Sequence, residues 1–190
     1  MKIFSFCLLL STFFCAVLTG GCALTAREKY ETVTYDLQQL SIAPQQSILT
    51  VGKVINSSPG GNSMLYRMAE NKIVQDPFQR WIQTPDKLLK RYYDNQFPLA
   101  AGTHASKLVN IYLELTAFEF DIPASEAVLT LSYIAFSGNN RQVGTISVRE
   151  KFAEKKAADF VSAMSRAAER AGQKLYQAAQ KVVEEPELLY

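Results

Sequence analysis

The side chains that could do chemistry are few in this sequence: a cysteine, a histidine and a pair of carboxylates. All three cysteines lie in the first 22 residues, and Cys22 is the last of them. His104 is the sole histidine and lies in the stretch AAGTHAS. Glu119 and Asp121 are two residues apart, so they would share one face of a strand. Cys22 could be modified, His104 could act as a base, and the carboxylates could bind a metal or act on a glycosidic bond.

Catalysis by these groups is the least favoured interpretation. A general base needs positioned partners, and His104 has no motif around it. The spacing patterns of serine hydrolases, zinc proteases, P-loops and dinucleotide-binding loops do not occur. One histidine and one exported cysteine are too few for a cysteine–histidine zinc site. We therefore expect a protein that is not an enzyme and has no metal and no cofactor, with Glu119 and Asp121 as surface charge.

The charge of the chain argues against a nucleic-acid partner. Its 190 residues carry 20 Lys and Arg against 18 Asp and Glu, a formal net charge of +2, and no block of like charge. Binding to phosphates requires clustered cations. The balanced composition is typical of an ordinary mixed surface, so we expect no nucleic-acid binding.

The first 21 residues have the organisation of an export signal. After a short basic start, an uncharged and largely apolar run covers 3–18, which is marginal for a membrane span and typical of a secretory signal. The stretch LTGGC then resembles a bacterial lipobox, in which Gly20 and Gly21 fill the two small positions and Thr19 stands where leucine is usual. The resemblance implies cleavage between Gly21 and Cys22, a thioether from the thiol to diacylglycerol, and acylation of the new amine.

Acylation also explains why the exported chain would retain a single cysteine. Cys7 and Cys15 lie inside the apolar run and would leave with the signal. A lone cysteine in an exported protein requires an explanation. Several acyl chains on Cys22 would form a stable anchor, because each added chain increases the buried hydrocarbon. An ordinary secretory signal that is cut elsewhere stays the alternative.

These features predict three parts of the chain. We expect a lipoprotein signal peptide over 1–21, a lipidated tether over 22–31 and a single domain over 32–190. The residue after Cys22 is Ala23 rather than aspartate. By resemblance to the enterobacterial sorting pattern, this implies a lipid-anchored protein of the outer membrane, with its domain on the periplasmic face.

Hydrophobic periodicity predicts the elements of that domain. The clearest strand covers 109–116, where apolar and polar residues alternate. Thr84 and Pro85 predict the start of a helix, with Thr84 as its cap. The other predicted strands cover 30–37, 47–56, two segments of 64–76 around a turn, 126–138 and 143–152, with the last three strands of the chain forming an antiparallel meander.

The last predicted element is a long helix over 156–184. It is rich in alanine, so it can lie close to a sheet, and Gly172 is its one weak position, at a cost of about 1 kcal/mol relative to Ala. The stripe could face a membrane or a partner helix, but core packing is favoured because one sheet face otherwise has no cover. We expect an α+β fold, with a mostly antiparallel sheet and two helices packed on one face. The apolar residues of the helix recur at steps of three and four: Phe160, Met164, Ala168, Ala171, Leu175, Ala178 and Val182.

Trp81, the only tryptophan, lies just before the first predicted helix. It could be a core residue that joins helix to sheet, or it could belong to a contact surface, where tryptophan is enriched. The core is the favoured interpretation.

In these ordered features the chain resembles the ABC-type transport auxiliary lipoproteins, the paraquat-inducible lipoprotein C type. The series of a tyrosine–arginine pair (Tyr66, Arg67), an arginine–tryptophan pair (Arg80, Trp81), and then proline and leucines is its most specific part. The segments that carry the resemblance follow the lipobox and read YDL, SILTVGKV, MLYRMAENKI, FQRWIQTPDKLL and DFVSAMSRAAERAGQKL.

The resemblance implies a non-enzymatic component of a mammalian-cell-entry (MCE) and ABC-type transport system for phospholipid or other hydrophobic molecules. The lipoprotein would dock the periplasmic tunnel at the outer membrane, with an MCE-domain protein and its ABC transporter as partners. A ring of identical copies is one form this could take. We assign Arg67, Arg80 and Trp81 to the partner surface. A standalone envelope-assembly or chaperone-like periplasmic lipoprotein is the alternative.

The assignment of Cys22 can be tested directly. Cys22→Ala removes the thiol that would carry the lipid, so we expect the variant to lose palmitate labelling and to stay unprocessed or become soluble. Labelling with radioactive palmitate and membrane fractionation measure both effects. Unchanged membrane anchoring of the variant would refute the lipoprotein assignment.

Overall fold

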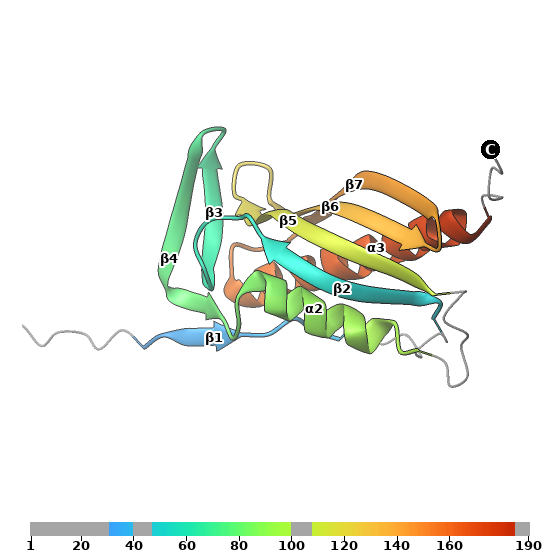
Figure 1. Ribbon diagram of the computed structural model, residues 1–190. Coiled ribbons are helices and arrows are strands. Elements are labelled where there is room, and N and C mark those ends of the chain that lie inside the picture. The colour runs from blue at the N-terminus through green and yellow to red at the C-terminus, as the bar shows by residue number, and fades with distance from the viewer. Residues whose placement is uncertain (1–30, 40–46, 100–107, 185–190) are drawn as a thin grey trace, which may run out of the picture. The chain divides into compact units, whose positions relative to one another are not determined.

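The structure, a computed structural model, describes residues 31–39, 47–99 and 108–184 (Figure 1). The described elements confirm the α+β prediction, with a mostly antiparallel sheet and two helices, the second of which is the long C-terminal helix. In chain order the elements are β1 (Val33–Tyr35), β2 (Leu49–Asn56), β3 (Ser63–Ala69), β4 (Lys72–Trp81), α2 (Pro85–Gln96), β5 (Val109–Asp121), β6 (Glu126–Ser137), β7 (Asn140–Lys151) and α3 (Ala157–Glu184).

β5 connects the two halves of the sheet because it pairs with three other strands. On one side it pairs antiparallel with β6, and β6 pairs antiparallel with β7, which is the predicted meander. On its other side, the first half of β5 pairs with β2 and its last two residues pair with β3, both in parallel. β4 then pairs antiparallel with β3, and the short β1 pairs in parallel with β4. The sheet is therefore mixed, and its longest ladders are antiparallel.

The first and fourth strands differ from their predicted bounds. β1 has three residues rather than the predicted 30–37, and it pairs only with Gln79–Trp81 of β4. β4 continues past the predicted end at Asp76. Oδ1 of Asp76 accepts hydrogen bonds from the main-chain N–H groups two and three residues later, each at 2.8 Å, and this irregularity carries the strand beyond Pro77.

The two helices lie on the same face of the sheet, with α2 alongside β2 and α3 across β5 to β7 (Figure 1). Thr84 precedes α2 with an extended backbone, but its side chain makes no capping hydrogen bond, contrary to the prediction. The hydroxyl of Tyr93 donates to the main-chain oxygen of Ala168 at 3.3 Å, which joins α2 to α3 inside the core. The buried face of α2 consists of Pro85, Leu88, Leu89, Tyr92 and Tyr93.

Small side chains let α3 lie close against the sheet. Every residue of the predicted apolar stripe is buried, which confirms core packing of this helix. Gly172 lies where α3 meets the end of α2, because a Cβ added there would come within 2.2 Å of Oε1 of Gln96. The alanines of α3 with no exposed surface are Ala163, Ala167, Ala168, Ala171 and Ala179.

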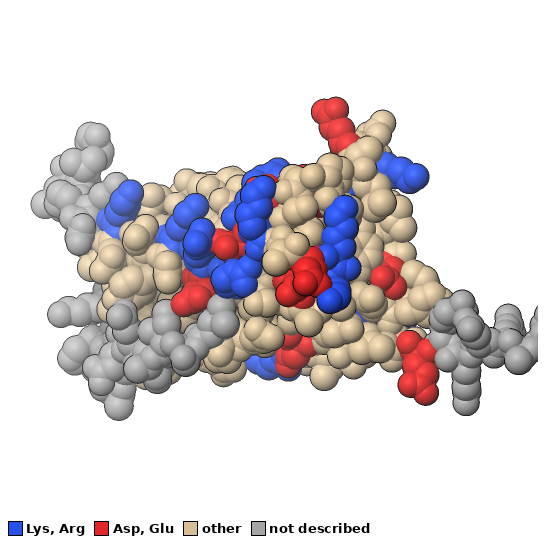
Figure 2. Space-filling model, turned by 180° about the vertical axis from the view of Figure 1, so that it is seen from behind, with Lys and Arg blue, Asp and Glu red and all other residues tan. Residues whose placement is uncertain are grey.

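Cations of α3 cover the outer edge of β7. Nη2 of Arg166 donates to the main-chain oxygen of Lys151 at 2.7 Å, and Nζ of Lys174 donates to that of Ser147 at 3.4 Å. Oε1 of Glu150 on β7 lies 2.7 Å from Nη1 of Arg170 on α3, which is an ion pair. Figure 2, from behind, shows Lys and Arg side chains gathered in a band with acidic residues among them. These contacts use polar groups that an edge strand would otherwise offer to another chain.

The close approach of α3 predicts that added volume there is destabilising. Ala168→Leu should lower the free energy of unfolding by about 1–3 kcal/mol, because the fully buried site has no room for the larger side chain. Gln177→Leu, on the exposed side of the same helix, should change it by less than about 0.5 kcal/mol. Urea unfolding followed by circular dichroism measures both. Equal values for the two variants would contradict the close packing of α3.

Candidate functional site

Three residues singled out in the sequence lie outside the described residues. Gly21 and Cys22 fall in the region of the predicted cleavage and lipid attachment, and His104 falls in the stretch between α2 and β5. The lipid attachment at Cys22 therefore stays a prediction. The described candidates, Arg67 and Trp81 together with Arg80, all lie on the hairpin of β3 and β4.

Trp81, at the end of β4, is completely buried. Its ring centroid is 5.1 Å from that of Phe118, edge-on, and 6.2 Å from that of Phe120. Its main-chain N–H donates to the oxygen of Asn62 at 2.7 Å. The structure therefore places Trp81 in the core, as the favoured interpretation had it. Its assignment to the partner surface is corrected, because the aromatic residues of β5 cover its ring.

Arg67 of β3 forms a two-pronged ion pair with Glu119 of β5. Nε of Arg67 lies 2.5 Å from Oε1 of Glu119, and Nη2 lies 3.0 Å from Oε2. The third nitrogen, Nη1, donates to the main-chain oxygen of Glu70 at 2.6 Å, near the hairpin turn. The hydrogen bond to Glu119 raises the pKa of the Arg67 guanidinium. This pair ties the hairpin to the central strand.

The prediction that Glu119 is surface charge is wrong. Its side chain is 6% exposed, because β3 joins the end of β5 and brings Arg67 over it. Asp121 makes different contacts: its Oδ1 accepts from the N–H of Ala124 at 3.0 Å, and its Oδ2 lies 3.5 Å from Nη1 of Arg149. The two carboxylates are therefore engaged separately.

Tyr66, next to Arg67, points to the opposite face of the hairpin and packs against the helix side. Its ring lies 5.5 Å from that of Phe160 on α3 and 5.9 Å from that of Phe120. Its hydroxyl donates to Oε1 of Gln79 at 3.0 Å. Burial raises the pKa of the Tyr66 hydroxyl, and the negative charge of Asp76 raises it further. The tyrosine–arginine pair thus fixes both faces of the hairpin close to its turn.

Arg80, next to Trp81 at the end of β4, is half-buried. It pairs with Thr34 of β1 and with Ser63 of β3, so strands flank it on both sides. Its buried Nε has no hydrogen-bond partner among the described residues. Of the three proposed surface residues, Arg67 and Arg80 keep accessible surface and Trp81 does not.

Both strands of the β3–β4 hairpin expose large apolar side chains. β1 pairs only with the last three residues of β4, so the described residues place no strand beside the rest of that edge. The hairpin projects from the sheet (Figure 1). Single exposed apolar residues are common, but several on one projecting element make that element a candidate contact surface. These side chains are Met68, Ile73, Val74 and Phe78, each more than a third exposed.

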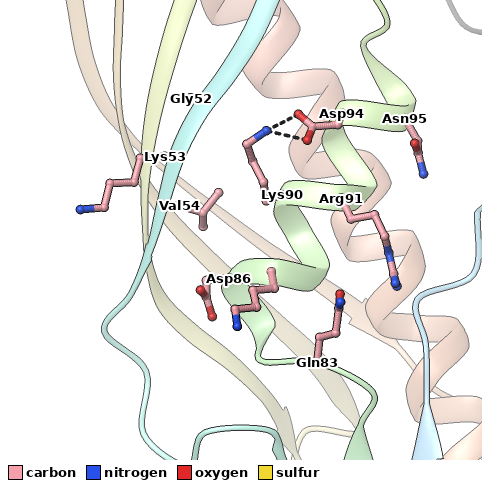
Figure 3. Close-up of a pocket in the computed structure, with 10 residues that line it drawn as sticks. Gly52, Lys53, Val54, Gln83, Asp86, Lys90, Arg91, Asp94 and Asn95 are labelled. Carbon is pink, nitrogen blue, oxygen red and sulfur yellow. Dashed lines mark hydrogen bonds and ion pairs between the residues drawn. The ribbon is translucent and has the colours of Figure 1, made fainter.

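A groove between β2 and α2 was missed by sequence reasoning (Figure 3). It encloses about 530 Å³ and is lined from the strand side by Gly52, Lys53 and Val54. The signal that could have revealed it is the run of charged residues on the outer face of α2, at positions 86, 87, 90, 91 and 94. Its strand wall could not be inferred, because the pairing of β2 was unknown.

The described ranges contain neither a metal-binding cluster nor a membrane-spanning helix. No group of three or more His, Cys, Asp or Glu side chains in 31–39, 47–99 and 108–184 is placed to hold a metal ion. Among the same residues, no helix is long and apolar enough to cross a membrane.

Comparison with known proteins shows the fold. No family model matches the chain, and no curated protein matches it. The crystal structure of an uncharacterized protein overlays with a TM-score of 0.64 at 13% identity, covering 78% of this chain and 98% of that one. Protein XCC0632 from Xanthomonas campestris, of the family DUF330, overlays with a TM-score of 0.57 at 13% identity, covering 83% of this chain and 89% of that one. A candidate lipoprotein from Caulobacter crescentus is 18% identical over 53% of this chain and 84% of its own, with a TM-score of 0.37.

The ion pair between Arg67 and Glu119 predicts a measurable loss of stability when it is broken. Arg67→Ala leaves the buried carboxylate of Glu119 without its partner and should cost about 3 kcal/mol, near the low end for a broken buried pair because Arg67 is 28% exposed. Arg149→Ala breaks only exposed contacts to Asp121 and Glu126 and should cost at most about 1 kcal/mol. Urea unfolding of both variants, and of Arg67→Ala combined with Glu119→Ala, measures this. If Arg67→Ala costs no more than Arg149→Ala, the pair does not hold the hairpin.

Proposed function

We propose that this protein is a non-enzymatic lipoprotein of the outer membrane that docks the periplasmic tunnel of an MCE/ABC-type system transporting phospholipid or other hydrophobic molecules. The observation that carries the proposal is the fold it shares with the DUF330 protein of Xanthomonas campestris. That likeness, at 13% identity, concerns the fold alone. The proposed transport role comes from the auxiliary-lipoprotein family that the sequence motifs resemble.

The N-terminal sequence supports the proposed location. LTGGC offers a cysteine for lipid attachment after an export signal, and Ala23 favours delivery to the outer membrane. Acylation of Cys22 would hold the domain at the periplasmic face, where a tunnel protein that spans the periplasm would end. The partners in this proposal are an MCE-domain protein and, through it, an inner-membrane ABC transporter.

The β3–β4 hairpin supplies a surface suited to docking. Near its turn it is fixed on one face by Arg67 and Glu119 and on the other by Tyr66 against Phe160. Strand β4 presents Val74 and Phe78 to solvent. A rigid element with exposed apolar side chains binds another protein without first losing much conformational freedom. We therefore place the contact with the tunnel protein on this hairpin rather than on Trp81.

Photo-crosslinking in the native organism tests the partner and the surface together. A photoreactive amino acid at Val74 or Phe78 should give a crosslink to an MCE-domain protein, identified by mass spectrometry. The matched control is Val143, which is 62% exposed on β7, far along the chain from the hairpin. We expect no such crosslink from that position. Deletion of the gene should reduce the lipid asymmetry of the outer membrane.

The possible outcomes separate the parts of the proposal. A crosslink to the MCE-domain protein from Val143 and not from the hairpin would keep the function and refute the surface. Recovery of no MCE-domain protein from any position, with unchanged lipid asymmetry after deletion, would refute the transport role. Crosslinks to envelope-assembly proteins instead would favour the standalone alternative.

A further inference from the structure

β2 is an edge strand whose outer side is open to another chain. It pairs with β5 on one side, and the described residues place no strand along Gly52–Asn56 on the other. The main-chain oxygen of Ile48 accepts from Val109 of β5 at 2.8 Å. Because neighbouring residues of a strand direct their main-chain groups to opposite sides, Ser47 faces outward. Its N–H donates to the oxygen of Pro98 at 3.2 Å, so main-chain pairing on this side already occurs just before β2.

The edge strands β7 and β2 therefore differ in how their outward main-chain groups are bonded. On β7, Arg166 and Lys174 of α3 donate to outward main-chain oxygens. On β2, the register with β5 shifts between Val51 and Val54, and no described side chain donates to the main chain of Gly52, Lys53 or Val54. Natural proteins usually cover or block a free edge, because it is a template for strand addition. An edge left open beside a groove is a candidate binding site.

The opposite wall of the groove is one face of α2. Its lining residues follow the helix from Gln83 to Asn95 at alternating steps of three and one. Gln83 and Asn95 are twelve residues apart, which at about 1.5 Å per residue corresponds to about 18 Å along the helix. An extended chain rises about 3.3 Å per residue, so the groove matches five or six residues of a strand. In Figure 3, the Val54 side chain lies between β2 and α2 while Lys53 points away from the helix. Gly52, which has no side chain, exposes its main chain beside them.

The charge of the groove favours an acidic occupant. Four cations line it, namely Lys53, Lys87, Lys90 and Arg91, against the two carboxylates Asp86 and Asp94, which leaves two positive charges. Lys90 is already paired with Asp94 at 2.5 Å, and Arg91 with an aspartate outside the groove. Lys53 and Lys87 make no ion pair with another described residue. Once the pairing of Arg91 with that aspartate is counted, the groove keeps one net positive charge, from Lys53 and Lys87 against Asp86.

We propose that this groove binds an extended, acidic peptide segment of another protein by strand addition to β2. The segment would pair its main chain with the open edge, and its carboxylates would meet Lys53 on the outer side and Lys87 on the helix side. An elongated groove with a main-chain wall suits a peptide better than a compact phosphate or lipid headgroup. The proposal does not depend on the transport role, because it rests on the edge, the groove and its charge.

The test uses the full chain in mild detergent and a fluorescent eight-residue peptide of alternating Glu and Thr, blocked at both ends. We expect saturable binding by fluorescence anisotropy. The same peptide with an N-methyl group on every residue lacks main-chain donors on both edges, and the same peptide with Lys in place of Glu lacks the charge. Each should bind at least tenfold more weakly. Hydrogen exchange should slow at the amides of 52–56 when the acidic peptide is bound.

Matched charge reversals place the site. Lys53→Glu with Lys87→Glu should weaken peptide binding at least tenfold, whereas Lys155→Glu with Lys156→Glu, exposed before α3, should change it less than twofold. Thermal unfolding of both double variants checks that they fold, and the exchange pattern of the native chain stands independently of them. No binding up to about 1 mM peptide, equal binding of the N-methylated peptide, or protection elsewhere in the chain would overturn the proposal. Binding of inorganic phosphate or phosphatidylglycerol vesicles that depends on the same lysines, without peptide binding, would overturn it in favour of an anion site.

Discussion

The position of β5 in the middle of the sheet is the constraint on which the rest of the domain depends. One face of its first half, Val109 to Leu115, is buried under the helices, and β5 pairs directly with β2, β3 and β6. Near its other end, Glu119 binds Arg67 and Phe118 and Phe120 cover Trp81. The hairpin, the groove wall and the meander are all oriented by this single strand.

The elements with a local period were predictable from the sequence, and the contacts between distant segments were not. Alternation over 109–116 and the three–four spacing in α3 follow from which face is buried, so both predictions are confirmed. The parallel pairing of β2 with β5 leaves no local signal. The burial of Glu119 could not be predicted either, since its partner Arg67 is 52 residues away. Trp81 was predicted better as a core residue than as a surface residue, because its size favours burial wherever aromatic neighbours are available.

The candidate surfaces were predictable only in part, for the same reason. The tyrosine–arginine and arginine–tryptophan pairs lie on one hairpin, but most of their side chains hold that hairpin rather than face a partner. The apolar side chains that do face outward, such as Val74 and Phe78, have no distinctive spacing in the sequence. The open edge of β2 depends on which strands are its neighbours, a property of the whole sheet. Specific sequence motifs here identify the framework, and the surfaces appear only once the framework is assembled.

The position of β1 also limits how far the domain could move from a membrane. β1 begins to pair with β4 at Val33, so with a lipid on Cys22 the free tether would have about 11 residues. A fully extended chain of that length reaches at most about 40 Å. A tether this short would restrict the domain to a thin layer above the lipid headgroups. Collisions between neighbouring copies and with envelope proteins would then become nearly two-dimensional. The length of one short linker would then decide which partners the domain can meet.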